Sequence, residues 1–169
     1  MKVRSRAFRR KFVRAGAVTL ELILVFPFLV IALMAVVQFG LLFSNQQRLE
    51  MASRAGAKVA SEMTLPEIDM DPVPAAIQNA INRELSNSGI VADRIIVQHN
   101  VGSNPPYTLI SGALNCPAPT TPPLPASRQY VRVTVCAGTT KLAPNLLKTY
   151  GFDLSGRISQ QTTTLRYDQ

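Results

Sequence analysis

One carboxylate of this chain stands where carboxylates are costly. Glu21 comes directly before an apolar run, Leu22–Phe43, in which Gln38 is the one strongly polar residue. A carboxylate in hydrocarbon costs on the order of a few kcal/mol, so such a residue usually has a function and a partner. Gly16 lies five residues earlier and ends a leader that contains seven basic residues. Gly16 and Glu21 are therefore the first candidates for a functional site.

The other reactive side chains form no pattern typical of catalysis or metal binding. His99 is the only histidine and has no second ligand type at metal spacing, so we expect a surface or partly buried histidine. Glu67, Asp69 and Asp71 form an acidic trio, either a weak cation site or a solvated loop with a helix cap. No serine lies in a nucleophile-elbow pattern, and no glycine-rich loop precedes a basic helix start. The sequence predicts neither an enzyme nor a bound metal or other cofactor.

The apolar run is long enough to cross a membrane. Leu22–Phe43 spans 22 residues, about 33 Å of helix, and the hydrocarbon core of a bilayer is about 30 Å thick. The apolar core of a secretory signal peptide has only about 7–15 residues, so this run is too long for one. A basic leader before such a run predicts a cytoplasmic N-terminus and an exported body.

The net charge of +8 is concentrated in the leader. Beyond Gly16 there are 11 basic and 10 acidic side chains, so the body is nearly neutral. Binding nucleic acid requires a basic face across a folded domain. The nearly neutral body has no excess of basic residues to form one, so we exclude a nucleic-acid-binding function. The leader, residues 1–16, has no apolar periodicity, and we expect Met1–Arg14 to lack regular structure.

Cys116 and Cys136 are the only cysteines, and both fall in the exported part. A pair of cysteines there is more often a disulfide than a metal site. Closing a loop of about 20 residues stabilises the fold by roughly 3 kcal/mol in the chain-entropy model. The loop between them is rich in proline, at Pro117, Pro119, Pro122, Pro123 and Pro125. The alternative is two unpaired thiols in the core.

We expect one continuous helix from Ala17 to Met63. Beyond the apolar run one face is charged, the opposite face is apolar at spacings of three and four, and Pro66 ends the pattern. Ala52, Gly56 and Ala60 form a row of small residues that lets another helix or a sheet approach closely. The alternative is a membrane helix followed by a separate linker helix. The apolar face comprises Leu49, Ala52, Gly56, Val59 and Met63.

Residues 64–169 predict a small α+β head. Asp71 as cap and Pro72 as first residue begin a second, short helix, and Gly89 ends it. Tyr130–Ala137 alternates as a half-buried strand does. Three or four antiparallel strands with a helix over one face form such a head. The candidate strands are Ala92–Val101, Tyr107–Ile110, Tyr130–Ala137 and Phe152–Tyr167.

The N-terminal segment resembles the class III signal of type IV prepilins. It consists of a basic leader, Gly16, four mostly apolar residues, Glu21 and a long apolar helix. The resemblance implies cleavage between Gly16 and Ala17 by a membrane aspartyl prepilin peptidase on the cytoplasmic side. A side chain at Gly16 would crowd the scissile bond. The resemblance also implies that Glu21 meets the N-terminal amine of a neighbouring subunit. Two charges that are each costly in an apolar bundle become tolerable together.

A narrower resemblance covers residues 14–60. Four segments are similar to the TadE-like family of minor pilins, or pseudopilins, of tight-adherence (Flp-type) pilus systems. They are Gly16–Glu21, Val25–Phe28, Gln38–Gly40 and Ser53–Ala57. The family marks are the proline in the membrane helix, the Phe-Gly near its end and the Arg-Ala-Gly after it. Gln38 departs from the family, which often has an acid at this position.

The sequence therefore predicts a pilin-like α+β protein that is not an enzyme. The two resemblances imply a minor pilin or pseudopilin of a Tad pilus, or of a related type II/IV secretion machinery, used in assembly and adhesion. We expect a single-pass protein of the bacterial inner membrane with a periplasmic head that joins an extracellular pilus. Its partners would be the prepilin peptidase, other pilins, the inner-membrane assembly platform and the lipid bilayer. The alternative is an uncleaved membrane anchor that presents a periplasmic binding domain within an export complex.

Overall fold

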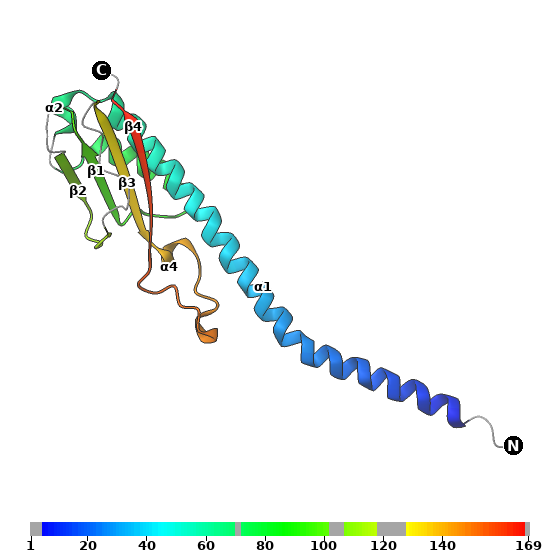
Figure 1. Ribbon diagram of the computed structural model, residues 1–169. Coiled ribbons are helices and arrows are strands. Elements are labelled where there is room, and N and C mark those ends of the chain that lie inside the picture. The colour runs from blue at the N-terminus through cyan, green and yellow to red at the C-terminus, as the bar shows by residue number, and fades with distance from the viewer. Residues whose placement is uncertain (1–4, 70–71, 102–106, 118–127, 168–169) are drawn as a thin grey trace.

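The structure is a computed structural model that describes residues 5–69, 72–101, 107–117 and 128–167, with the backbone alone for residues 5–17 and 65. A long helix, α1 (Ser5–Glu62), carries a small head along its C-terminal half (Figure 1). The sheet order is β2-β1-β3-β4, and each neighbouring pair is antiparallel. This arrangement confirms the predicted α+β class. In chain order the head contains α2 (Leu65–Ile68), α3 (Ala75–Ser86), β1 (Arg94–His99), β2 (Tyr107–Ser111), β3 (Tyr130–Gly138), α4 (Thr139–Leu142), the 3₁₀ helix η1 (Lys148–Tyr150) and β4 (Ile158–Arg166).

α1 runs for 58 residues without a break between its apolar and its amphipathic half. Helix geometry makes it about 87 Å long. It bends within its blue, N-terminal part (Figure 1), the part that contains Pro27, and a proline removes a backbone hydrogen bond and commonly bends a helix. The helix begins at Ser5, so the prediction of a leader without regular structure is wrong for residues 5–14. No glycine or proline precedes Gly16, and arginine, lysine and alanine all favour helix.

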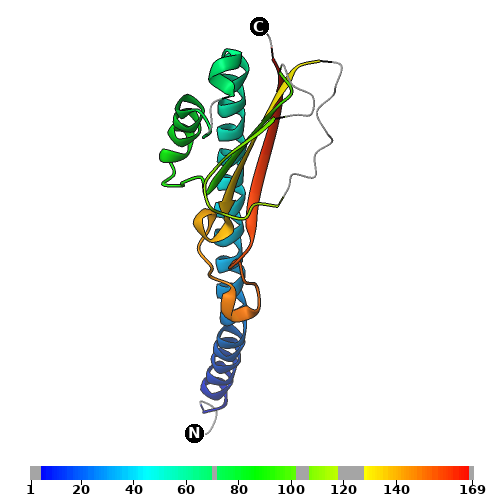
Figure 2. The same ribbon diagram turned by 90° about the vertical axis from the view of Figure 1, so that its left-hand side faces the viewer.

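The amphipathic half of α1 packs against β3 and β4 on one side and against α3 on the other (Figure 2). Ser53 is buried in this face, and its hydroxyl oxygen lies 2.7 Å from that of Thr163 on β4. Because the sheet and α3 both cover the helix, its buried face is wider than the predicted apolar stripe. Its buried residues are Leu49, Ala52, Ser53, Gly56, Ala57 and Ala60.

α3 begins at Ala75, after a second proline, so the prediction that Pro72 is its first residue is wrong. Pro74 stands at the N-cap with ψ of 137°, and the ring of a proline also pushes the residue before it into extended backbone. The predicted cap, Asp71, lies outside the described residues. Gly89 does end the helix. It has φ of 66°, and the N–H of Ile90 reaches the carbonyl of Leu85 at 3.3 Å, as in a Schellman motif.

The acidic trio does not act as a unit in the described residues. Glu67 caps α2, where its carboxylate accepts hydrogen bonds from the backbone N–H and the hydroxyl of Thr64, at 3.0 and 2.8 Å. These bonds, the backbone one first, lower the pKa of Glu67. Asp69 lies beside His99 instead.

β3 is buried on both faces, so the prediction of a half-buried strand is wrong. On the face away from the helices, Cys136 packs with Cys116 and Ile96. Beside them the hydroxyl oxygens of Thr134 and Thr162 lie 2.9 Å apart. The segment that carries Cys116 thus covers the part of this face around Cys136, a contact that strand periodicity cannot indicate. The residues that face the helices are Val131, Val133, Val135 and Ala137.

β4 begins at Ile158 rather than at Phe152. The residues before it form a compact loop with η1, and Gly151 and Gly156 take φ of 90° and 73°. Such backbone strongly favours glycine and cannot continue a strand. The whole segment between β3 and β4, residues 139–157, therefore lies outside the sheet and forms a separate part of the head.

Candidate functional site

The predicted cleavage site lies within the helical backbone of α1, and Glu21 lies about one turn beyond Ala17. Glu21 is exposed and borders a shallow depression that it shares with Val18, Leu22 and Val25. The part of the chain that the structure describes offers Glu21 no hydrogen bond and no ion pair. The carboxylate is thus open to a partner outside the described residues.

The surface around Glu21 is apolar on all sides of the helix. The most apolar stretch of α1, long enough to cross a membrane, has no buried residue. Large side chains such as Phe28 and Val36 are 69% and 71% exposed. Among the described residues, α1 is the one helix long and apolar enough to cross a membrane. A helix that is hydrophobic all round requires lipid or other apolar surfaces around it.

The predicted row of small residues lies where α1, α3 and β3 meet. A methyl group at Gly56 would come within 2.8 Å of the Ile81 side chain on α3 and 3.3 Å of Val133 on β3. Ala52 and Ala60, one turn to each side, have no exposed surface. The absence of a side chain at Gly56 therefore permits the close approach of the three elements.

The head also extends along α1 to Gln38, at the end of the apolar half. The Gln38 side chain is fully buried, and its Oε1 accepts a hydrogen bond of 2.8 Å from the backbone N–H of Leu147. Next to it the ring of Phe39 packs edge-on against Phe152, with centroids 5.1 Å apart. The one polar residue of the apolar run is thus a contact between helix and head.

A third contact lies two turns further along α1. Asn45 Nδ2 donates a hydrogen bond of 2.6 Å to the carbonyl oxygen of Leu142. Losing the partner of a buried polar group costs about 1–3 kcal/mol, so these contacts hold residues 139–157 firmly on α1. We call the three contacts the clamp: Gln38–Leu147, Phe39–Phe152 and Asn45–Leu142.

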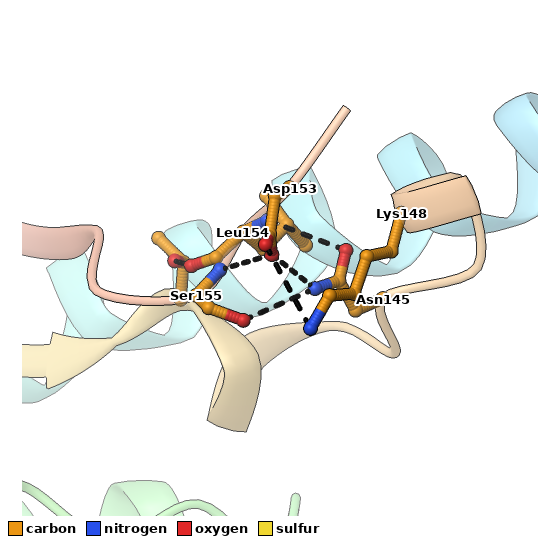
Figure 3. A network of polar contacts seen from close by, with 6 residues as sticks. Asn145, Lys148, Asp153, Leu154 and Ser155 are labelled. Atoms are coloured by element: carbon orange, nitrogen blue, oxygen red, sulfur yellow. Dashed lines mark hydrogen bonds and ion pairs between the residues drawn. The ribbon is translucent and has the colours of Figure 1, made fainter. Parts of the chain in front are cut away.

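Asp153 organises the loop that the clamp holds (Figure 3). Its Oδ1 accepts hydrogen bonds from Asn145 Nδ2 at 2.6 Å and from the N–H of Ser155 at 2.8 Å. Asn145 Oδ1 accepts one of 3.3 Å from the N–H of Leu154, and Lys148 Nζ lies 3.8 Å from Asp153 Oδ2. The bond from Ser155 N–H, then that from Asn145, lower the pKa of Asp153 to about 2. The carboxylate therefore stays charged well below neutral pH and keeps its donors.

The structure contains a disulfide between Cys116 and Cys136, with Cα atoms 6.4 Å apart. It ties the segment after β2 to the middle of the sheet. Most of the proline-rich loop that it closes, including Pro119 and Pro125, lies outside the described residues. Within the described residues, no cluster of histidine, cysteine, aspartate and glutamate could hold a metal ion.

His99 is fully buried, so the prediction of a surface or partly buried side chain is wrong. It follows Ile95 and Val97 on the face of β1 that points into the core. Its Nε2 lies 3.0 Å from Asp69 Oδ1, within reach of charge attraction, although neither ring nitrogen makes a well-directed hydrogen bond among the described residues. Burial lowers the pKa of His99, and the nearby Asp69 carboxylate offsets part of that effect.

Sequence reasoning missed the role of Gln38 and the position of His99. The period of two from Ile95 through Val97 could have placed His99 inside. An amide in an otherwise apolar run was a signal for Gln38, but its partner Leu147 lies 109 positions away, so the sequence could not name that contact.

Residues 16–58 match the model of the TadE-like protein family. The matched segment begins at Gly16, contains Glu21 and Gln38, and ends in the amphipathic half of α1, before the head. The match confirms the resemblance predicted from the sequence of this segment, and it suggests a minor-pilin-like component of a Tad pilus. No curated protein and no solved structure matches the chain.

Proposed function

We propose that this chain is a non-enzymatic minor pilin or pseudopilin of a Tad (Flp-type) pilus or a related type II/IV secretion machinery. The observation that carries the proposal is Glu21, a carboxylate with no partner among the described residues, on a helix surface that is apolar all round. Such a surface requires lipid before assembly and neighbouring helices after it. The TadE-like match over the same residues supports this function.

In this proposal α1 crosses the inner membrane with its N-terminus in the cytoplasm and its head in the periplasm. The basic leader sets that orientation. A prepilin peptidase cleaves between Gly16 and Ala17, and the new ammonium group lies about one turn from Glu21. In the filament Glu21 of one subunit pairs with this group of the next, because each charge alone is costly in an apolar bundle. The pair would fix the axial register between helices that otherwise offer only apolar contacts.

The partners of this function follow from its steps. The prepilin peptidase removes the leader, the inner-membrane assembly platform extracts the subunit from the bilayer, and other pilins or pseudopilins receive its helix. The head remains outside the helical bundle, where it contributes to adhesion or secretion.

Glu21→Gln tests the charge pair directly. We expect this variant to lose its leader normally but to be absent from sheared filaments, since the amide keeps the size of the side chain and removes its charge. Mass spectrometry of the N-terminus reads out processing, and immunoblots of filament and membrane fractions read out assembly. Glu50→Gln, which removes a carboxylate of the same helix beyond the apolar run, is the matched control and should assemble.

Two outcomes would contradict the proposal in different ways. A native chain that still begins at Met1 would favour the uncleaved membrane anchor within an export complex. Normal incorporation of Glu21→Gln into filaments would show that the charge of Glu21 is not needed for assembly.

A further inference from the structure

The segment between β3 and β4 forms the end of the head that lies furthest along α1 toward the N-terminus. Both views show its orange tip, η1, in this position beside α1 (Figures 1 and 2). The clamp holds the segment against Gln38, and Asp153 holds the loop together. The tip is thus a fixed structure at the level where the exposed apolar half of α1 ends.

The clamp limits how far a membrane can extend along α1. The loop that covers Gln38 carries turns and polar backbone groups, which have no water to bind in the hydrocarbon of a bilayer. The hydrocarbon must therefore end before Gln38. The hydrocarbon core is about 30 Å thick. The 21 residues Ala17–Val37, which end just before Gln38, form about 32 Å of helix. This span begins at the residue that cleavage after Gly16 would make the first.

The side chains at the level of the clamp are those typical of a lipid–water interface. Tyr150 on η1 is 57% exposed, and Leu146, four positions earlier in the chain, is also exposed. Across the helix from the buried Gln38 and Leu42, Phe43 is 61% exposed. The Lys148 side chain is largely exposed as well. Tyrosine favours the headgroup layer because its ring is apolar and its hydroxyl is polar, and lysine extends its amine from apolar surface into water.

We propose that the tip Leu146–Tyr150 rests on the lipid headgroup layer of the leaflet through which α1 leaves the membrane. The clamp then sets the depth of the helix, so that the membrane span is Ala17–Val37 rather than the Leu22–Phe43 of hydropathy alone. This inference rests on the proposed membrane insertion of α1, and it adds a lipid contact of the head itself.

The shifted span changes the environment of Glu21. If the hydrocarbon began at Leu22, the Glu21 carboxylate would lie in the headgroup region and need no partner. With a boundary at Ala17, it lies four residues inside, about 6 Å below the surface of the hydrocarbon. The depth set by the head at one end of the helix therefore places Glu21 in lipid at the other end.

The chain contains no tryptophan, so one introduced tryptophan reports its own depth. We would reconstitute the full-length chain in vesicles of phosphatidylethanolamine and phosphatidylglycerol that contain spin-labelled lipid. Tyr150→Trp should emit at shorter wavelength than a water-exposed tryptophan. It should lose fluorescence to a label on the headgroup but not to a label near the end of the acyl chain.

Two further variants separate this inference from membrane insertion itself. Tyr107→Trp places the same ring on an exposed site at the opposite end of the sheet, where Tyr107 pairs with His99, and should resist both labels. Phe26→Trp, within the apolar half, should be quenched by the acyl-chain label. If Phe26→Trp is quenched and Tyr150→Trp behaves like Tyr107→Trp, the lipid contact of the tip is wrong while insertion stands. Quenching of Tyr150→Trp by the acyl-chain label would overturn the boundary at Gln38, and no quenching of Phe26→Trp would overturn both proposals.

Discussion

His99 shows how a single buried residue can make the fold depend on pH. Its ring has no exposed surface, and burial lowers its pKa below 6.5 despite the nearby Asp69 carboxylate. In the unfolded chain the same ring binds a proton near its ordinary pKa of about 6.5. Below that pH the unfolded state therefore binds more protons than the folded state, and acid favours unfolding.

We expect the free energy of unfolding to fall as the pH drops from about 7.5 to about 5.5, through the range in which an ordinary histidine titrates. The loss attributable to His99 cannot exceed about 1.4 kcal/mol per pH unit. Denaturant titrations of the full chain in detergent at several pH values measure it. His99→Phe keeps an aromatic side chain at this position and removes the titration, so it should flatten this part of the profile. An unchanged slope in His99→Phe would assign the acid sensitivity to another group.

At the scale of residues, local spacing could be predicted and distant contacts could not. Gly16 and Glu21 could be singled out because they stand five residues apart and because the apolar run begins directly after Glu21. The buried state of Gln38 depends on Leu147, and that of His99 depends on the segment around Asp69. Neither neighbour is fixed by the sequence around the residue itself.

At the scale of elements, the segment 139–157 departs most from expectation. The sequence predicts a strand from Phe152, whereas the chain forms a loop that Asp153 and two glycines hold together. β3 could be predicted as a strand because its valines alternate with polar residues, although it is buried on both faces. The loop follows instead from hydrogen bonds to α1, which leave no periodic pattern.

Gln38→Leu should loosen this loop from α1. The leucine keeps the volume of the side chain but leaves the N–H of Leu147 without an acceptor, which costs about 1–3 kcal/mol. Part of this cost is offset, because Gln38 Nε2 has no hydrogen-bond partner among the described residues. We expect faster hydrogen exchange at the Leu147 amide and unchanged protection in β3.

Gln47→Leu, on the exposed side of the same helix, is the matched control and should leave the exchange of Leu147 unchanged. Equal protection of Leu147 in Gln38→Leu and in the unsubstituted chain would mean that the rest of the clamp is sufficient.

At the scale of the whole molecule, the α+β class could be predicted because the chain changes from a helical to a strand period after Gly89. The way in which the head sits on α1 could be predicted only in part. The small residues indicated a close approach, but the sequence does not say that α3 and β3 both reach Gly56. That arrangement arises from the order of the strands, in which β3 lies between β1 and β4.

Gly56→Leu should separate the head from α1. Its side chain would collide with Ile81 and Val133, and overpacking of this kind costs about 1–3 kcal/mol or more. We expect thermal unfolding in detergent at a clearly lower temperature. Gly40→Leu is the control, because nothing lies within 4 Å of a methyl group at Gly40, and it should be nearly neutral. Adding Ile81→Ala to Gly56→Leu should restore part of the stability, and a failure to do so would place the strain elsewhere.

The contacts between head and helix also determine how the molecule bears force. They extend from Gln38, at the clamp, to Met63, whose carbonyl oxygen accepts a hydrogen bond of 2.6 Å from the Tyr167 hydroxyl. Twenty-five residues separate these ends, about 38 Å of helix. Tension along α1 loads the contacts between them side by side, in shear, so they must yield nearly together. A head attached at one end would instead peel away contact by contact, at a much smaller force.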